Sequence, residues 1–486
     1  MTTTEVPGPT RLLEPLRAVA RRRPDAVALE GPDAALTYRE LLGRIDDAAT
    51  RMRAAGVAPG DTAVLHTTRD ARLPVTLLAA WSAGMCVALL DAGLPAARIT
   101  ACETVIRPRW RLSGGPTGLI EPHIEPHDVT GARPARGGSH ILLTSGTTGG
   151  PAAVLIGPDA LRRTLDWYAD TFRPGPEDRV ALLAGLGHDP LLRDILVPLS
   201  SGGTLLVPPA DVFAHPAALL GFVRSAAPTV LHATPALLEL LLAADTAAHG
   251  GGLRSLRLVV SGGARLDAGL ARRLRRACEA TLVNAYGATE TPQIASCAPV
   301  DVAALDAAGV PDDAGLDVGG GVAGAELLLD PESGEVVVRS PSLALGYLDA
   351  TGRAGRFAAD PRGAAGYRAY RTGDRGERLP GGGIRITGRL DRELSVNGFR
   401  LAPEEIESAA RRHPLVLEAH AQSVPGPAGD VLGLTVVPVA GAHIAPGVLR
   451  THLAALLPRH AVPARIRTAP GLTLGPTHKA TPGKWS

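Results

Sequence analysis

Aromatic residues, cysteines and net charge are all scarce in this sequence. Phe, Trp and Tyr make up 3% of the 486 residues, and the formal net charge is +2. So few rings and so little charge excess are not typical of nucleic-acid-binding proteins, which need stacking platforms and basic surfaces. The four cysteines are far apart and form no CxxC pair: Cys86, Cys102, Cys278 and Cys297. This spacing argues against a zinc site or a disulfide framework and predicts a protein of the reducing cytoplasm.

The sequence also lacks an obvious targeting or membrane-spanning segment. Residues 1–10 contain no basic stretch followed by an apolar one, as a signal peptide would. The uncharged run at residues 73–90 has a marginal length for a membrane span and includes Pro74 and Gly84. We interpret this run as a buried helix, a turn at Ala83–Gly84 and a buried strand, and we predict no membrane partner.

Strand and helix patterns alternate between residues 140 and 290. Apolar runs that predict strands lie at 140–144, 179–186, 203–209, 228–235, 256–263 and 280–287. Helical periodicity separates most of them, at 158–172, 189–201, 236–244 and 266–280. This alternation predicts an α/β fold with mostly parallel sheets flanked by helices. Ligands of such sheets bind beyond the carboxyl ends of the strands, so the polar loops there are the candidate site.

The pattern changes after residue 318. Residues 325–340 read as two strands around a turn, which indicates a β-rich subdomain, and residues 350–370 read as exposed loop. A smaller α+β pattern of two helices and two strands follows residue 391. We therefore predict a large N-terminal domain at residues 1–390, and a small, mobile C-terminal domain at residues 391–486.

Several polar loops after predicted strands contain residues suited to nucleotide chemistry. The Ser/Thr/Gly loop at 144–150 offers hydroxyls and backbone N–H groups for an anion, but it lacks the Gly-Lys-Ser/Thr of a Walker A loop, and such a composition alone is more often that of an ordinary loop. Glu290 could ligate Mg²⁺, or it could belong to the acidic first turn of a helix. Asp374 could accept two ribose hydroxyls or cap a turn. Lys479 lies in a Gly/Pro/Thr-rich tail that could equally be frayed.

Seven stretches in this order resemble one family, and the resemblance covers nearly the whole chain. They are residues 36–61, 81–91, 142–154, 284–290, 334–348, 370–375 and 388–400. The family is that of the adenylate-forming enzymes, and more specifically the adenylation domains of nonribosomal peptide synthetases. Seven motifs in register make a chance match very improbable.

The resemblance implies that a carboxylate reacts with ATP in the presence of Mg²⁺ to give an acyl-adenylate and pyrophosphate. The pyrophosphate end of ATP would be enclosed by Thr144, Ser145, Gly146, Thr147, Thr148 and Gly149. Thr289 would contact the α-phosphate, and Glu290 would hold Mg²⁺. Tyr286 would lie against adenine, Asp374 would bind the ribose hydroxyls, and Arg389 would assist there.

The resemblance also implies a mobile small domain and a carrier partner. Lys479 matches the lysine that bridges the substrate carboxylate and ATP, although residues 477–479 read Thr-His-Lys instead of the usual Asn-Gly-Lys and Lys484 offers another register. Asp391 matches the hinge about which the small domain rotates. A phosphopantetheine thiol then takes the acyl group, and because no carrier domain follows Lys479 we expect this thiol on a separate carrier protein.

The same resemblance locates a specificity pocket. Asp189 falls at the carboxylate that pairs with the α-ammonium group of amino-acid substrates, and His188 stands in place of an aromatic residue. The other pocket positions would be Pro190, Arg193, His232, Val259, Ser261, Ala285, Gln293 and Ile294. Because Arg193, His232 and Gln293 are polar, we expect an α-amino acid with a polar side chain, for instance one that carries a carboxylate or a carbonyl group. Alternatively, Arg193 turns to solvent or to Asp189 itself.

Two other functions stay open at this stage. One is an acyl-CoA synthetase-like ligase, against which Asp189 argues. The other is a nucleotide-binding relic, since Ala152 stands where the family usually has lysine, and Ser395 and Asn397 stand where basic residues are common. Glu290, Asp374, Arg389 and Lys479 argue against a relic. For Ala152 we expect weaker ATP binding, and we expect that Ala152→Lys lowers the KM for ATP.

Overall fold

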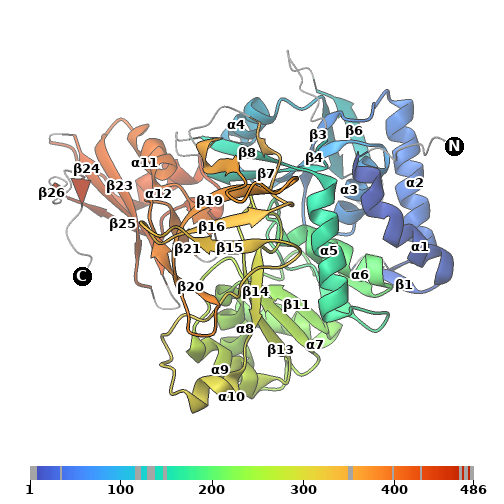
Figure 1. Cartoon of the computed structure of the whole chain (residues 1–486). Helices are drawn as coiled ribbons and strands as arrows, with labels where there is room; N and C mark the ends of the chain where they lie inside the picture. The colour runs from blue at the N-terminus through green and yellow to red at the C-terminus, as the bar shows by residue number, and fades with distance from the viewer. Residues whose placement is uncertain are drawn as a thin grey trace.

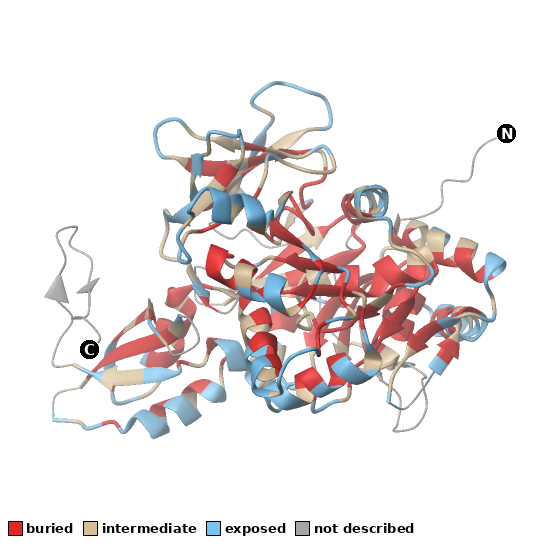
Figure 2. Ribbon diagram, turned by 90° about the horizontal axis from the view of Figure 1, so that it is seen from below, coloured by how far each residue is buried: buried red, intermediate tan, exposed pale blue. Residues whose placement is uncertain are grey.

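Most of the chain has a defined place in the computed structural model. The described residues are 8–32, 35–114, 122–127, 137–145, 150–348, 354–396, 399–426, 430–439, 441–469, 473–474 and 480–481. The N-terminal helices lie at one end of the molecule and the C-terminal strands at the other (Figure 1). Buried strands form the interior, and the helices around them turn exposed faces outward (Figure 2).

An eight-stranded sheet forms the first half of the core. Its strands in spatial order are β14 (Ser296–Pro299), β13 (Thr281–Tyr286), β12 (Leu258–Ser261), β11 (Val230–Ala233), β9 (Arg179–Ala181), β10 (Thr204–Leu206), β1 (Val27–Glu30) and β2 (Ala35–Thr37). All neighbours from β13 to β1 are parallel, and only the edge strands β14 and β2 are antiparallel. The carboxyl ends of β11, β12 and β13 therefore meet at one edge of this sheet.

A seven-stranded sheet forms the second half. Its order is β17 (Gly346–Tyr347), β8 (Pro151–Ile156), β7 (His140–Ser145), β4 (Cys86–Asp91), β3 (Thr62–Thr67), β5 (Trp110–Gly114) and β6 (Pro122–Pro126). The alternation at 140–290 thus divides between two sheets, because β7 pairs with β4 rather than with β9. Local patterning predicts a strand but does not specify its partner, which tertiary packing decides.

Helices cover both faces of the eight-stranded sheet, as predicted. The helices that precede the β-rich region, on either of the two sheets, are α1 (Glu14–Arg22), α2 (Tyr38–Ala54), α3 (Arg72–Ser82), α4 (Ala96–Ile106), α5 (Pro158–Phe172), α6 (Pro190–Ser201), α7 (Pro216–Ala226), α8 (Pro235–Ala247), α9 (Ala268–Ala277) and α10 (Val302–Ala307), with a 3₁₀ turn η1 at Gly8–Leu13. Leucines of α7, α8 and α9 pack with Val259 and Leu282 on one face. Tyr168 of α5 and Val197 of α6 pack with Val260 on the other.

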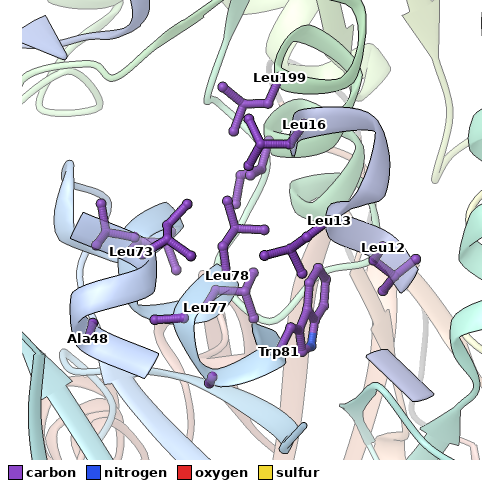
Figure 3. Close-up of a cluster of buried hydrophobic side chains, with 14 of the residues drawn as sticks. Leu12, Leu13, Leu16, Ala48, Leu73, Leu77, Leu78, Trp81 and Leu199 are labelled. Carbon is purple, nitrogen blue, oxygen red and sulfur yellow. The ribbon is translucent and has the colours of Figure 1, made fainter. Parts of the chain in front are cut away.

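The uncharged run at 73–90 is a buried helix followed by a buried strand, as predicted. Its helix is α3 and its strand is β4, and Gly84 between them has a φ of 85°, which favours glycine. Leu73, Leu77, Leu78 and Trp81 of α3 contact leucines from η1, α1 and α6 in a buried cluster (Figure 3). Among the described residues, no helix has both the length and the apolar character that a bilayer crossing requires. All four cysteines are free thiols.

A β-rich sheet follows, consistent with the hairpin pattern after residue 318. It contains β15 (Glu326–Leu329), β16 (Glu335–Ser340), β19 (Arg368–Arg378), β18 (Phe357–Ala359) and β20 (Ile384–Arg389), and a 3₁₀ turn η2 at Ala354–Arg356. The prediction of a simple loop over 350–370 was wrong for β18, which pairs with β19. Its residues are mostly exposed, so the sequence there carries little of the hydrophobic alternation that signals a strand.

The C-terminal segment has its own apolar cluster, which draws all its members from residues 394–466. Its elements are β21 (Leu394–Val396), β22 (Phe399–Leu401), α11 (Pro403–Arg411), β23 (Val416–Val424), β24 (Val431–Pro438), α12 (Pro446–Ala454), η3 (Arg459–Ala461), β25 (Arg465–Thr468), β26 (Thr473–Leu474) and β27 (Ala480–Thr481). The predicted helices and strands of this segment are present, and β23, β24 and β25 form one sheet.

Candidate active site

The start of α6 places two charged side chains of the predicted pocket near one another. Pro190 occupies the first turn of α6, where its missing N–H costs nothing, and Asp189 precedes it. The Asp189 carboxylate does not cap the helix. Arg193 follows four residues later, so both side chains project from the same face of the helix.

Gln293 binds Asp189 from the loop between β13 and β14. The Gln293 backbone N–H donates to Oδ2 of Asp189, and its Nε2 donates to Oδ1 (2.6 Å) and to the Asp189 carbonyl (2.8 Å). Gln293 has a φ of 69°, a left-handed conformation that costs free energy in a residue other than glycine. Burial raises the pKa of Asp189 to about 6, although the Gln293 donors and the nearby Arg193 charge oppose this. Asp189 is thus a poorly solvated carboxylate whose hydrogen-bond donors among the described residues are neutral groups of Gln293.

His232, another predicted pocket residue, belongs to a buried hydrogen-bond network. Its Nδ1 lies 2.6 Å from Oδ1 of Asp194, and its Nε2 lies 2.9 Å from the Tyr168 hydroxyl. Burial and the charge of Arg193 lower the pKa of His232, so the ring is neutral. A neutral ring that donates to Asp194 accepts from Tyr168, which leaves His232 no free nitrogen for a substrate.

Arg193 contrasts with His232 because two of its guanidinium nitrogens are buried without an acceptor among the described residues. The residue is 5% exposed, and in the described part of the chain neither Nε nor Nη1 has a hydrogen-bond acceptor. The alternative in which Arg193 turns to solvent is therefore wrong, and no hydrogen bond joins it to Asp189. Burial lowers the pKa of Arg193. Tyr168, Asp194 and Asp189, which act on it through their charge without a hydrogen bond, raise this pKa.

The remaining pocket positions do not form a single wall. Ala285 and Ile294 pack in the cluster that contains Tyr168. Val259 lies in the cluster on the opposite face with α8 and α9, so its side chain is separated from that group. The prediction that Val259 joins these residues was wrong in this respect, because residues alternate between faces along a strand. Ser261 is fully buried, and its hydroxyl has no partner in the described part of the chain.

Asp374 is the centre of the predicted nucleotide half. It lies on β19, and its pair in the strand register is Arg389 of β20. Oδ1 accepts from Arg389 (2.7 Å), and Oδ2 accepts from Arg400 (2.6 Å) and the Tyr286 hydroxyl (2.6 Å). Burial alone would raise the pKa of Asp374, but the guanidinium groups of Arg400 and Arg389 hold it below its usual value.

The predicted hinge residue Asp391 is tied to the same cluster. Its carboxylate accepts from Arg389 (2.9 and 2.7 Å) and from Arg356 of η2 (2.6 Å). Burial would raise the pKa of Asp391, and these two guanidinium groups lower it. The chain that leads into the C-terminal segment is therefore anchored to strand β20 and to the turn η2.

Glu290 is 3% exposed and follows β13. Its Oε1 accepts a hydrogen bond from the Tyr347 hydroxyl (2.5 Å), and burial and the Glu290 charge raise the pKa of Tyr347. Among the described residues no group of three or more His, Cys, Asp and Glu side chains could hold a metal ion. A Mg²⁺ ion at Glu290 would thus take its remaining ligands from phosphate and water, which this hard cation accepts. A buried carboxylate with a neutral partner fits this ion.

The Ser/Thr/Gly loop is described only at its edges. Thr144 lies near the end of β7, opposite Ala152 of β8. Its buried hydroxyl has no partner in the described part of the chain. Tyr347, the partner of Glu290, pairs with Val154 of the same strand β8. Both Thr144 and Glu290 are therefore connected to β8, Thr144 by strand pairing and Glu290 through Tyr347. Thr289, beside Glu290, is half-buried. Thr144 offers an unused donor for a phosphate there.

Some predicted site residues lie outside the described residues. They are Gly146, Thr147, Thr148, Gly149 and Lys479, as well as Asn397; Ser145 is described only as the last residue of β7. Ala152 is described and is completely buried. A lysine at that position would place its stem in the core, which argues against the expectation that Ala152→Lys improves ATP binding.

The C-terminal segment contributes a hairpin to the site. Phe399 of β22 stacks on His460 (ring centroids 3.9 Å apart) and meets the edge of His188 (4.6 Å). Arg400 of the same strand binds Asp374, as described above, and Arg98 of α4 forms an ion pair with Glu405. Burial and the charge of Arg69 lower the pKa of His188 to about 4. His188 thus packs as a neutral ring beneath the hairpin.

Sequence reasoning did not find several partners of the predicted residues. These are Tyr168, Asp194, Tyr347, Arg356 and Arg400. Tyr347 and Arg400 lie inside stretches quoted for the resemblance, so a closer look at 334–348 and 388–400 could have identified them. Tyr168 and Asp194 lie on helices with no local polar signal, and only the packing of α5 and α6 against β11 brings them to His232.

Comparisons with known proteins agree with this architecture. The family model for AMP-binding enzymes matches residues 16–114 and 121–348. Phenyloxazoline synthase MbtB of Mycobacterium sp. (strain MCS) is 32% identical over 473 residues, which cover 92% of this chain and 39% of that protein. The chain therefore spans well under half of that relative's length.

Two solved structures share the fold. The artificially fused adenylation–PCP di-domain NpsA-ThdA from Klebsiella oxytoca has a TM-score of 0.80 at 22% identity, covering 96% of this chain and 94% of that one. The amide bond synthetase McbA from Marinactinospora thermotolerans also has a TM-score of 0.80, at 23% identity, covering 96% and 98%. The predicted α/β fold class is confirmed. The chain belongs to the AMP-binding enzyme family, as an adenylate-forming protein related to the adenylation domains of nonribosomal peptide synthetases.

Proposed function

We propose that this chain uses ATP and Mg²⁺ to activate an α-amino acid with a polar side chain as its aminoacyl-AMP. It then transfers the aminoacyl group to the phosphopantetheine thiol of a separate carrier protein in natural-product biosynthesis. Membership of the family supports an ATP-dependent, adenylate-forming ligase.

One observation carries the amino-acid substrate. The Asp189 carboxylate is bound by the neutral donors of Gln293, and Arg193 acts on it through its charge without a hydrogen bond. A poorly solvated carboxylate gains most from a cationic partner. The α-ammonium group of an amino acid supplies such a cation, whereas a simple carboxylic acid does not.

In the nucleotide half, Asp374 would accept the ribose hydroxyls and Tyr286 would lie against adenine. Arg389 holds Asp374 ionised, as their 2.7 Å contact indicates. Thr144 and Thr289 would donate hydrogen bonds to phosphate oxygens. A Mg²⁺ ion at Glu290 would neutralise charge that develops on the phosphates, the usual role of such an ion.

The transfer step would use motion of the C-terminal segment about Asp391. We propose that residues 391–486 form the small mobile domain and residues 1–390 the core. The separate apolar cluster of residues 394–466 supports this division, because a segment with its own core can move as a unit. The Klebsiella oxytoca protein joins an adenylation domain to a PCP, which supports a carrier partner for this chain.

An ATP–pyrophosphate exchange assay over the twenty amino acids tests the first half-reaction. We expect exchange with one or a few amino acids and none with the same acids lacking the α-amino group. Equal exchange with the deaminated acids would favour the acyl-CoA ligase, and exchange with no acid at all would favour a nucleotide-binding relic. Loading of a phosphopantetheinylated carrier, compared with coenzyme A as acceptor, tests the transfer step.

The tail can be tested because the sequence has only two lysines, Lys479 and Lys484. If Lys479 bridges the carboxylate and ATP, Lys479→Ala lowers the rate of adenylate formation by roughly 100-fold or more, the effect of losing one charge-stabilising donor. Lys484→Ala is the matched control and keeps nearly full activity. The reverse result would shift the register to Lys484.

A further inference from the structure

The guanidinium of Arg193 lacks a hydrogen-bonded acceptor in the described part of the substrate half, although the charges of Asp194 and Asp189 act on it. It is 5% exposed, and two of its three nitrogens are buried without an acceptor in the described part of the chain. A guanidinium stays protonated in proteins, so this is a buried positive charge and not a neutral group. Such a charge needs an anionic partner.

The carboxylates nearest in sequence are already bound to other groups. Both oxygens of Asp194 are used: Oδ1 by His232 (2.6 Å), and Oδ2 by the backbone N–H groups of Leu183 (3.2 Å) and Ala184 (3.0 Å). Both oxygens of Asp189 accept from Gln293. Neither carboxylate is hydrogen-bonded to Arg193, so the described part of the chain leaves its Nε and Nη1 without an acceptor.

His232 and the amide nitrogen of Gln293 are bonded within the protein. His232 has both nitrogens bonded, and the Nε2 group of Gln293 is bonded to Asp189. Among the described residues, the groups that stay open beside Asp189 are Nε and Nη1 of Arg193, which are donors, and Oε1 of Gln293, which is an acceptor. The positive charge of Arg193 favours a carboxylate over a carbonyl, because a hydrogen bond between two charged groups is stronger than one to a neutral acceptor.

We propose that Arg193 binds a carboxylate on the side chain of the substrate, so that this chain activates an acidic α-amino acid. The proposal rests on the function proposed above. Asp189 and Arg193 lie four residues apart, about one turn of α6, so two charges of opposite sign project from the same side of the helix. An acidic amino acid matches them with its α-ammonium group at Asp189 and its side-chain carboxylate at Arg193.

A panel on the wild-type protein tests this specificity directly. Exchange is measured with aspartate, glutamate and 2-aminoadipate, and with asparagine, glutamine, leucine, valine and phenylalanine. We expect the best acid to exceed its matched amide in kcat/KM by at least roughly 30-fold, the lower end of the effect of a buried charge pair. A preference for an amide or an apolar amino acid would overturn the proposal.

The stability of Arg193→Met separates a binding role from a structural one. Methionine fills a similar volume without a charge, so the substrate-free variant should unfold at the same or a higher temperature than wild type. Arg257→Met is the matched control, because Arg257 forms two hydrogen bonds of 2.6 Å with Asp178 and its loss should lower the Tm. A clear fall in Tm for Arg193→Met would show a structural role and overturn the proposal.

Substrate binding by the same variant completes the test. The preferred acidic amino acid should raise the Tm of wild type in the presence of ATP and Mg²⁺, and it should not raise that of Arg193→Met. Arg193→Met should also lose at least roughly 30-fold in kcat/KM for the acid and less for its amide. Retained acid preference in the variant would overturn the proposal.

The two proposals fail in different ways. If the chain does not activate amino acids, no member of the panel supports exchange above background, and deaminated dicarboxylic acids do as well as amino acids. If only the role of Arg193 is wrong, exchange is strong but peaks with an uncharged amino acid. The wild-type panel alone distinguishes these results, whatever the behaviour of the variants.

Discussion

The two halves of the candidate site differ in how their charges are matched. In the nucleotide half, Asp374 accepts hydrogen bonds from Arg389, Arg400 and Tyr286, and Glu290 accepts from Tyr347. In the substrate half, Arg193 has no acceptor on Nε or Nη1 within the described residues. The nucleotide half is thus held in place by protein contacts, whereas the substrate half leaves a charge for the ligand.

This difference has a consequence for stability. Matched buried charges stabilise only as a pair, and removing one partner leaves the other in a poorly solvated place. A buried charge without a hydrogen-bonded partner already carries that penalty in the folded state. Replacing it with a neutral residue should therefore leave the free energy of unfolding unchanged or raise it. Substitutions in the two halves should therefore act on stability with opposite signs.

The largest effect is expected for Asp374→Asn. The substitution removes the negative charge that matches Arg389 and Arg400, and both guanidinium groups then lose an ion pair of 2.7 or 2.6 Å. We expect the free energy of unfolding to fall by about 3 kcal/mol. Calorimetric or denaturant unfolding measures this free energy for Asp374→Asn and, for comparison, for Arg193→Met. Equal stability changes for the two variants would break the comparison.

Glu290→Gln should act on catalysis instead of stability. The Tyr347 hydroxyl can still donate to the amide oxygen, so the Tm should stay close to that of wild type. The weakened Mg²⁺ ligand should lower the rate of pyrophosphate release by roughly 100-fold. Excess Mg²⁺ should restore part of the rate. Activity within a few-fold of wild type at low Mg²⁺ would contradict the assignment of Glu290 to the metal.

Ala152→Lys should lower stability by about 2 kcal/mol, because Ala152 is completely buried in β8 and a lysine stem must displace packed atoms. Gly150→Lys is the control, since a Cβ at Gly150 meets no atom within 4 Å. Its stability should be nearly unchanged. Thermal unfolding and the KM for ATP are measured for both variants. A stable Ala152→Lys variant with a lower KM for ATP would restore the expectation from sequence alone.

The smallest effect concerns pH. Burial raises the pKa of Asp189 to about 6, and only the ionised carboxylate pairs with an ammonium group. The KM for the amino acid should therefore be constant above pH 6 and rise about tenfold for each pH unit below it. Initial rates between pH 5 and 8 measure this, and Asp189→Asn should give a high KM without the inflection. A flat wild-type profile would contradict the pairing.

Much of the fold could be read from the sequence because hydrophobic periodicity is local. The helix at 158–172 is observed at its predicted bounds, and the run at 73–90 is a helix and a strand with glycine at the turn. The strand over 179–186 is shorter than predicted, since only Arg179–Ala181 pairs with neighbours. The assignment of β7 to the second sheet had no local signal, because any apolar strand can pair with several partners.

The candidate site divides in a similar way. Asp374 and Arg389 could be named from their motifs, and the strand register then brings them together. Tyr168 and Asp194 could not be named, because their role at His232 depends on two helices packing against one strand. The side of β12 that Val259 faces was likewise decided by the sheet, not by its place in the sequence.

The sequence by itself determined the order of the motifs, the type of most elements and the family they indicate, because these depend on residues close together in the chain. Only the tertiary structure decided which charges are matched. Arg193 and His232 look alike in the sequence as polar pocket residues. Folding gives His232 two partners and leaves Arg193 with unpaired nitrogens in the described part of the chain, since partners for buried groups come from distant segments.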